Sequence, residues 1–123
     1  MKILIVDDDE LMLKTIDHTL KENGYEVVPA MDAEIALDIL RNEKIDLIIS
    51  DIMMPNVSGL RFINSLNNDD LGGIPVIVVS SLDKTMLTDD FLGERAAHFL
   101  AKPIDRYELL ISVRNAFNTK SKK

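Results

Sequence analysis

The chain has 123 residues, of which 46% are hydrophobic and 28% are charged, and its net charge at pH 7 is −7. This size and composition are typical of one globular domain and exclude a mainly disordered chain. The lack of cysteine excludes disulfides, thiolate metal sites and cysteine nucleophiles, and the apolar runs are far shorter than the ~20 residues that a membrane-spanning helix needs.

The negative charge is concentrated in the first half of the chain. Residues 1–61 hold 6 basic and 13 acidic side chains, whereas residues 62–123 hold 8 of each. Direct binding to nucleic acid relies on Lys and Arg, so we expect none, and the acidic half suits a divalent cation or a basic partner better. The N-terminal apolar run reaches Asp7 too early for a secretory signal, so we expect a cytoplasmic protein without membrane attachment.

Apolar runs alternate with amphipathic segments along the chain. In chain order, the sequence predicts a strand at 3–6, a helix at 10–22, a strand at 26–29, a helix at 33–43, a strand at 46–50, a helix at 60–66, a strand at 75–79, a helix at 83–94, a strand at 98–101 and a helix at 105–117. Asn23-Gly24 ends the first helix, and Pro29 favours the edge of a sheet for the second strand.

This alternation predicts an α/β fold made of five strand–helix units. The strands are apolar without polar alternation, which indicates a parallel sheet that helices cover on both faces. Right-handed connections then favour a doubly wound, flavodoxin-like sheet of five strands in the order 2-1-3-4-5. We expect one domain over residues 1–118, followed by a polar tail or the start of a linker at 119–123.

Four of the five predicted strands end in polar residues. These ends are Asp7-Asp8-Asp9-Glu10 after the first strand, Ser50-Asp51 after the third, Ser80-Ser81 after the fourth and Lys102-Pro103 after the fifth. In the order 2-1-3-4-5 these four strands are contiguous, and open α/β sheets bind ligands at the carboxyl ends of their strands. We therefore expect a functional site at this edge.

The residue types at these ends suit phosphoryl transfer. Carboxylates that lie a few strand spacings apart repel one another unless a cation joins them, and their oxygens suit Mg²⁺. The hydroxyl of Ser80 and the ammonium of Lys102 can hold an anion, and Asp51 on the central strand is the natural nucleophile. Taken singly, each residue also has a structural explanation, such as a helix cap for Asp8 or Asp9; their joint occurrence favours the functional interpretation.

Four motifs resemble the receiver domains of two-component response regulators. They are Val6-Asp7-Asp8, Asp51-Ile52-Met53-Met54-Pro55 with Gly59, Pro75 to Ser81, and Lys102-Pro103. The resemblance covers residues 2 to about 117. It implies a phospho-accepting switch, not an enzyme with a separate substrate, and a histidine kinase or a histidine phosphotransfer protein as the phosphoryl donor.

The resemblance also implies a role for each acidic residue of the site. Asp7 and Asp8 match the pair that binds Mg²⁺, for which Mn²⁺ is an alternative. Asp51 matches the phosphoacceptor, which also binds the metal, and Met53 matches the residue whose backbone carbonyl completes the protein ligands.

Three further residues match the part of the family pattern that responds to phosphorylation. Ser80 matches the switch hydroxyl, and Lys102, with an implied cis bond to Pro103, matches the lysine that pairs with the phosphoryl group. Phe99 matches the aromatic switch position, although an ordinary edge-strand aromatic explains it equally well. The responding surface is then formed by the last two predicted helices and the strand between them, which also offers a route to a phosphorylation-dependent homodimer.

Some residues depart from the family pattern, and other functions fit parts of the sequence. Arg95-Ala96-Ala97-His98 replaces a frequent Gly-Ala-Asp-Asp, which leaves the output and the partner open. A haloacid-dehalogenase-type phosphatase would explain the first acids but not the segment that follows Asp51. A flavin-binding module would place its phosphate against those acids, and a scaffold that is never phosphorylated usually lacks the acids or the lysine.

Overall fold

The computed structural model describes residues 1–51, 74–80 and 96–121, with side chains at all of these except 96–99 and 118–121. The helices predicted at 60–66 and 83–94 lie outside the described residues. In chain order the described elements are β1 (Lys2–Val6), α1 (Glu10–Glu22), β2 (Glu26–Ala30), α2 (Ala33–Asn42), β3 (Leu47–Asp51), β4 (Val76–Ser80), β5 (Ala96–Ala101) and α5 (Arg106–Ser121).

Most of these elements lie within two residues of their predicted bounds, but α5 is longer at its end. The helix continues to Ser121, into the polar segment that we expected to form a tail. That segment contains no Gly or Pro, so nothing in it breaks the backbone hydrogen bonds of a helix that has already formed.

The five strands form one parallel sheet in the predicted order β2-β1-β3-β4-β5. Among the described strands β2 pairs only with β1, so Pro29 lies on an edge strand as expected, opposite Ile5. β3 is central, with β1 on one side and β4 on the other. The order therefore places the four strands with polar ends next to one another.

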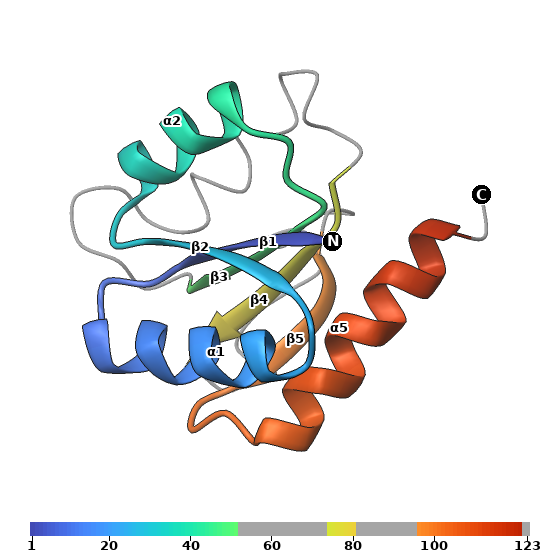
Figure 1. Ribbon diagram of the computed structural model, residues 1–123. Helices are drawn as coiled ribbons and strands as arrows, with labels where there is room; N and C mark the ends of the chain where they lie inside the picture. The colour runs from blue at the N-terminus through green and yellow to red at the C-terminus, as the bar shows by residue number, and fades with distance from the viewer. Residues whose placement is uncertain (52–73, 81–95, 122–123) are drawn as a thin grey trace.

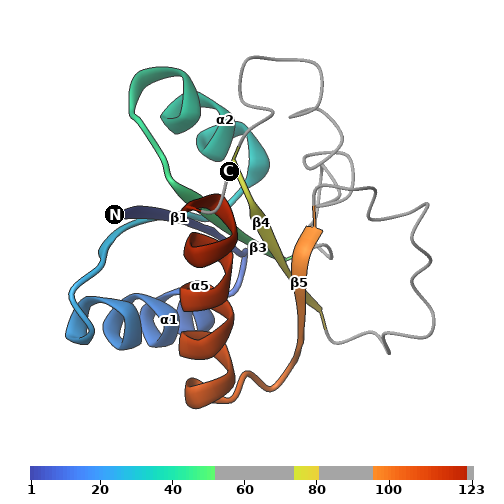
Figure 2. The ribbon, with the colours of Figure 1, turned by 90° about the vertical axis from the view of Figure 1, so that its right-hand side faces the viewer.

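Helices cover both faces of the sheet (Figures 1 and 2). α2 covers one face, where Leu4 and Ile48 of the sheet pack with Ala36 and Leu40 of the helix. α1 and α5 cover the other face, where Ile5 and Ile49 pack with residues that include Leu13, Ile16, Leu20, Leu109 and Val113. Successive strand residues alternate between these two cores, which explains why the strands are apolar throughout.

Local hydrogen bonds explain where the first helices begin and end. Asp9 caps α1, because its side chain accepts hydrogen bonds from the N–H groups of Leu11 and Met12, and Asp32 caps α2 in the same way. Gly24 follows α1 with a φ of 88°, a backbone conformation that favours glycine. In the described part of the chain, no helix is both long and apolar enough to cross a membrane.

Candidate functional site

The polar strand ends meet at the carboxyl edge of the sheet, as the strand order requires. Asp7 directly follows β1, Asp51 is the last residue of β3, Ser80 is the last residue of β4, and Lys102 directly follows β5. Backbone hydrogen bonds extend the sheet into this edge: the N–H of Asp7 donates to Ala30 at 3.1 Å, and the N–H of Lys102 donates to Ser80 at 2.9 Å.

Three carboxylates form a cluster at this edge. One oxygen from each of Asp7, Asp8 and Asp51 lies within 4.8 Å of the others. Asp7 and Asp51 are almost fully buried, with exposed fractions of 2% and 4%, whereas Asp8 is exposed. The cluster therefore has two buried carboxylates and a third that is exposed to solvent.

Lys102 lies against both buried carboxylates. Its Nζ is 3.0 Å from Oδ2 of Asp51 and 3.2 Å from Oδ2 of Asp7. The predicted proximity of Lys102 and Asp51 is thus confirmed, and the Lys102–Pro103 bond is cis as the resemblance implied. The second contact, between Lys102 and Asp7, is one that the sequence did not predict.

The pKa values of Asp7 and Lys102 are shifted by burial and by the charges of their neighbours. Burial raises the pKa of Asp7, and the Asp51 carboxylate adds to this, although the N–H of Asp9 and Lys102 act in the opposite direction. Burial lowers the pKa of Lys102, but its ion pairs with Asp51 and Asp7 outweigh this, and the net shift is upward. Because three carboxylates lie together and the Lys102 ammonium contacts two of them, a second positive charge would stabilise the cluster.

The donor set fits a hard divalent cation. Carboxylate oxygens are the ligands that Mg²⁺ prefers, and three of them converge from two neighbouring strand ends. Met53, whose carbonyl we predicted as a further ligand, lies outside the described residues.

The family model for the response regulator receiver domain matches residues 3–114. The chain belongs to this receiver domain family. It is 34% identical over 116 residues to the response regulator MprA of Mycobacterium sp. (strain KMS), an alignment that covers 93% of this chain and 49% of MprA. The chain thus spans about half the length of the MprA relatives that it matches.

Solved structures show the same fold. The chain resembles the receiver domain of the Francisella response regulator 1452 with 30% identity and a TM-score of 0.87, covering 96% of this chain and 97% of that one. It resembles the chemotaxis response regulator CheY4 of Vibrio cholerae with 28% identity and a TM-score of 0.85, covering 94% and 97%.

Membership of the family decides between the broad classes of function. Receiver domains belong to two-component signalling and are not catalytic enzymes in their own right. The phosphatase and flavin-binding interpretations are therefore set aside. Asp7, Asp8 and Asp51 form the acidic cluster of this receiver domain. It is the cluster that we predicted to bind the metal.

The residues that we predicted to transmit the signal are described to different extents. Ser80 is fully buried at the end of β4, one residue beyond the pairing of Asp51 with Val79. Phe99 lies in β5 opposite Val78, but its side chain is outside the described part. The switch roles of both residues stay predictions.

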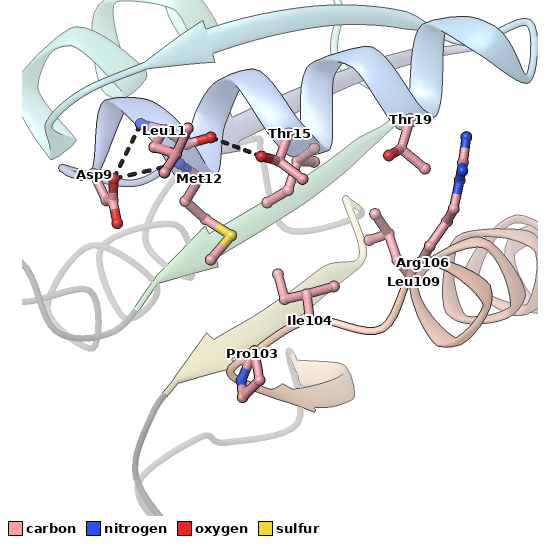
Figure 3. A pocket seen from close by; sticks show the side chains of 10 residues that line it. Asp9, Leu11, Met12, Thr15, Thr19, Pro103, Ile104, Arg106 and Leu109 are labelled. Atoms are coloured by element: carbon pink, nitrogen blue, oxygen red, sulfur yellow. Dashed lines mark hydrogen bonds between the residues drawn. The ribbon is translucent and has the colours of Figure 1, made fainter.

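Sequence reasoning also missed a pocket of about 260 Å³ beside the receiver site. It lies between α1 and the segment that follows β5, and Figure 3 shows its lining residues, which include Met12, Thr15, Pro103, Ile104 and Leu109. The lining comes from segments at opposite ends of the chain, so no local pattern indicated it.

Proposed function

We propose that this receiver domain accepts a phosphoryl group on Asp51 from a histidine kinase or a histidine phosphotransfer protein. The observation that supports this most strongly is the position of Asp51: buried at the end of the central strand, 3.0 Å from the Lys102 ammonium and beside two further carboxylates. The family supports this class of donor, and the position of Asp51 at the end of the central strand supports it as the acceptor.

The proposed reaction is a direct transfer between two nucleophiles. A carboxylate oxygen of Asp51 attacks the phosphorus of the donor phosphohistidine, so that a P–O bond forms while the P–N bond breaks. The imidazole nitrogen keeps the electron pair of the broken bond and takes up a proton. The product is an acyl phosphate on Asp51, and because a carboxylate has no proton to lose, the site needs no general base.

The residues around Asp51 prepare the site for the incoming charge. Asp7, Asp8 and Asp51 would hold a Mg²⁺ ion, or Mn²⁺ as the alternative, and we propose the backbone carbonyl of Met53 as a further ligand. The chemistry that the ion would supply is neutralisation of the carboxylates and of the phosphoryl oxygens. Lys102 would donate hydrogen bonds to the phosphoryl group from the other side.

We further propose that the signal leaves through the end of β4. Phosphorylation adds negative charge and acceptor oxygens at Asp51, and the Ser80 hydroxyl on the neighbouring strand would bond to them and draw its own strand end inward. Phe99 on β5 would then turn into the space behind it. The changed surface would comprise β5, α5 and the helix predicted at 83–94.

That surface offers apolar side chains to a target or to a second copy of the domain. Tyr107 and Ile111 are 74% and 59% exposed and lie one turn apart on α5. Such a pair on a helix surface suits a modest, reversible contact. We propose it as the part of the surface that a phosphorylation-dependent partner would cover.

Treatment with acetyl phosphate and Mg²⁺, followed by intact-mass measurement, tests the proposal. We expect one phosphoryl group on the wild-type domain and none on Asp51→Asn. Asp38→Asn is a matched control, because it removes an exposed carboxylate on α2, on the other side of the sheet from α1 and α5. An unmodified wild-type domain would instead indicate a scaffold that is never phosphorylated.

A further inference from the structure

Asp9 connects the first turn of α1 to a buried carboxylate of the proposed metal site. Its backbone N–H donates a hydrogen bond to Oδ1 of Asp7 at 2.9 Å. Its own Oδ1 accepts hydrogen bonds from the N–H groups of Leu11 and Met12 at 3.0 and 3.3 Å, as Figure 3 shows. A continuous series of hydrogen bonds therefore runs from Asp7 through the backbone and the side chain of Asp9 into the helix.

These hydrogen bonds restrict the orientation of the Asp7 carboxylate. The side chain of Asp7 is only 3% exposed, and its Oδ1 contacts an N–H group whose position depends on the cap of α1. The carbonyl of Asp9 also accepts the first backbone hydrogen bond of the helix, from the N–H of Leu13 at 3.0 Å. If the cap opens, the backbone of Asp9 becomes free to move, and the N–H that orients Asp7 moves with it.

We propose that Asp9 is a positioning residue for the metal site: by capping α1, it holds the N–H group that orients Asp7, and so it raises the affinity of the site for a divalent cation. The inference rests on the proposed metal site and deepens it. It gives Asp9 a role in the site although its carboxylate lies outside the cluster of three. Such coupling is reciprocal, so a bound cation should in turn stabilise the first turn of α1.

Variants of Asp9 separate the cap from the negative charge. Asn and Ser cap a helix about as well as Asp, whereas Ala does not. Asp9→Asn and Asp9→Ser should therefore bind Mg²⁺ within about twofold of the wild-type domain, because the exposed charge that they lose is screened. Asp9→Ala should bind Mg²⁺ about fivefold more weakly, a smaller loss than outright removal of a group that hydrogen-bonds to a metal ligand. Calorimetric titration measures all three affinities.

Asp32→Ala is the matched control, since it removes a cap of the same kind at the start of α2. Oδ1 of Asp32 accepts a hydrogen bond from the N–H of Ile35 at 2.8 Å, and its carboxylate is not part of the acidic cluster. This variant should lose stability as Asp9→Ala does, yet keep the Mg²⁺ affinity of the wild-type domain. An unchanged affinity in Asp9→Ala, an equal loss in Asp32→Ala or an equal loss in Asp9→Asn would each disprove the positioning role.

A second measurement uses the wild-type domain and does not depend on the folding of a variant. Amide hydrogen exchange of Leu11 and Met12 reports on the cap of α1, and exchange of Ile35 reports on the cap of α2. Saturating Mg²⁺ should slow exchange at Leu11 and Met12 about fivefold and leave Ile35 unchanged, because the coupling acts equally in both directions. No slowing at Leu11 and Met12, or equal slowing at all three amides, would overturn the inference.

Failure of this inference is distinguishable from failure of the proposed function. If the domain binds Mg²⁺ and is phosphorylated on Asp51 but the cap of α1 does not respond, only this inference fails. If the domain binds no Mg²⁺, the proposed metal site fails together with it. If the cap responds to Mg²⁺ and no phosphoryl group is found, the inference stands and the proposed function fails.

Discussion

The two ends of the same sheet carry the same kind of ion pair for different purposes. At the amino edge, Nζ of Lys2 is 3.0 Å from Glu43, with side chains 30% and 41% exposed. At the carboxyl edge, Nζ of Lys102 is also 3.0 Å from Asp51, but the carboxylate is only 4% exposed. Distance alone does not separate a structural ion pair from a functional one.

The two ion pairs differ in their burial and in the number of carboxylates around the lysine. At the amino edge the backbone of Lys2 is also fixed, since its N–H donates a hydrogen bond to the side chain of Asp46 at 2.9 Å. At the carboxyl edge, within the described part of the chain, the Lys102 ammonium contacts two buried carboxylates, and a third, exposed carboxylate lies in the same cluster. Such an imbalance lowers stability and is retained where a site needs unsatisfied charge to bind a ligand. Four substitutions test this contrast.

The largest effect is expected when the exposed acid of the carboxyl edge is neutralised. Asp8→Asn should weaken Mg²⁺ binding roughly tenfold or more, because it removes one of three charged oxygens. Asp9→Asn is the control: it removes an adjacent charge, and Asn still caps α1. Calorimetric titration with Mg²⁺ measures both, and equal losses would mean that only the overall charge matters.

The next largest effect is expected for Ser80, which we propose to transmit phosphorylation of Asp51 to β5 and α5. Ser80→Ala should still accept phosphate, but beryllofluoride, a mimic of the phosphoryl group, should shift the amide resonances of β5 and α5 far less than in the wild-type domain. A few charge-assisted hydrogen bonds of about 1.5–3 kcal/mol each are enough to drive such a switch. Thr15→Ala on α1 serves as the hydroxyl control. Shifts equal to those of the wild-type domain would refute the role of Ser80.

A smaller effect, a gain in stability, is expected when the buried Asp7 is neutralised. Because the pKa of Asp7 is raised in the folded domain, the folded state binds more protons than the unfolded state between the ordinary and the raised values. The free energy of unfolding therefore falls as pH rises through that interval, from about pH 4 upward. Asp7→Asn should abolish this fall and stabilise the metal-free domain by about 1 kcal/mol near neutral pH.

Denaturant unfolding in the presence of a chelator, at a series of pH values, measures this gain. The Asn side chain can still accept the hydrogen bond from Asp9, so the local turn is preserved. A variant less stable than the wild-type domain at neutral pH would show that the pair with Lys102 outweighs the burial of the charge.

The smallest effect is expected at the amino edge. Lys2→Met removes an exposed ion pair, and such pairs contribute little to stability because solvent and salt screen them. The thermal midpoint should stay close to that of the wild-type domain, and phosphorylation of Asp51 should be unchanged. A marked loss of either would mean that the two edges are coupled through the sheet.

Local patterns in the sequence were enough to predict the described helices and strands, and the preference for right-handed connections then gave the order of the sheet. Apolar periodicity, the stop at Asn23-Gly24 and the edge position of Pro29 depend on residues close together in the chain, and each is found in the structure. The sequence left the cap of α1 open between Asp8 and Asp9, and the structure has Asp9 in that position. The end of α5 was misjudged because a polar segment without Gly or Pro can continue a helix that has already formed.

The meeting of Asp7, Asp8, Asp51 and Lys102 at one edge also followed from the sequence, since parallel strands bring their carboxyl ends together. Only the tertiary structure decided which of these side chains are buried and which of them form ion pairs. The pattern did not distinguish Asp7 from Asp8, yet one is buried and the other exposed, and it did not show that Lys102 bridges Asp7 and Asp51. These contacts join residues that lie 51 and 95 positions apart along the chain. Their balance depends on burial, which arises only when the strands and helices pack together.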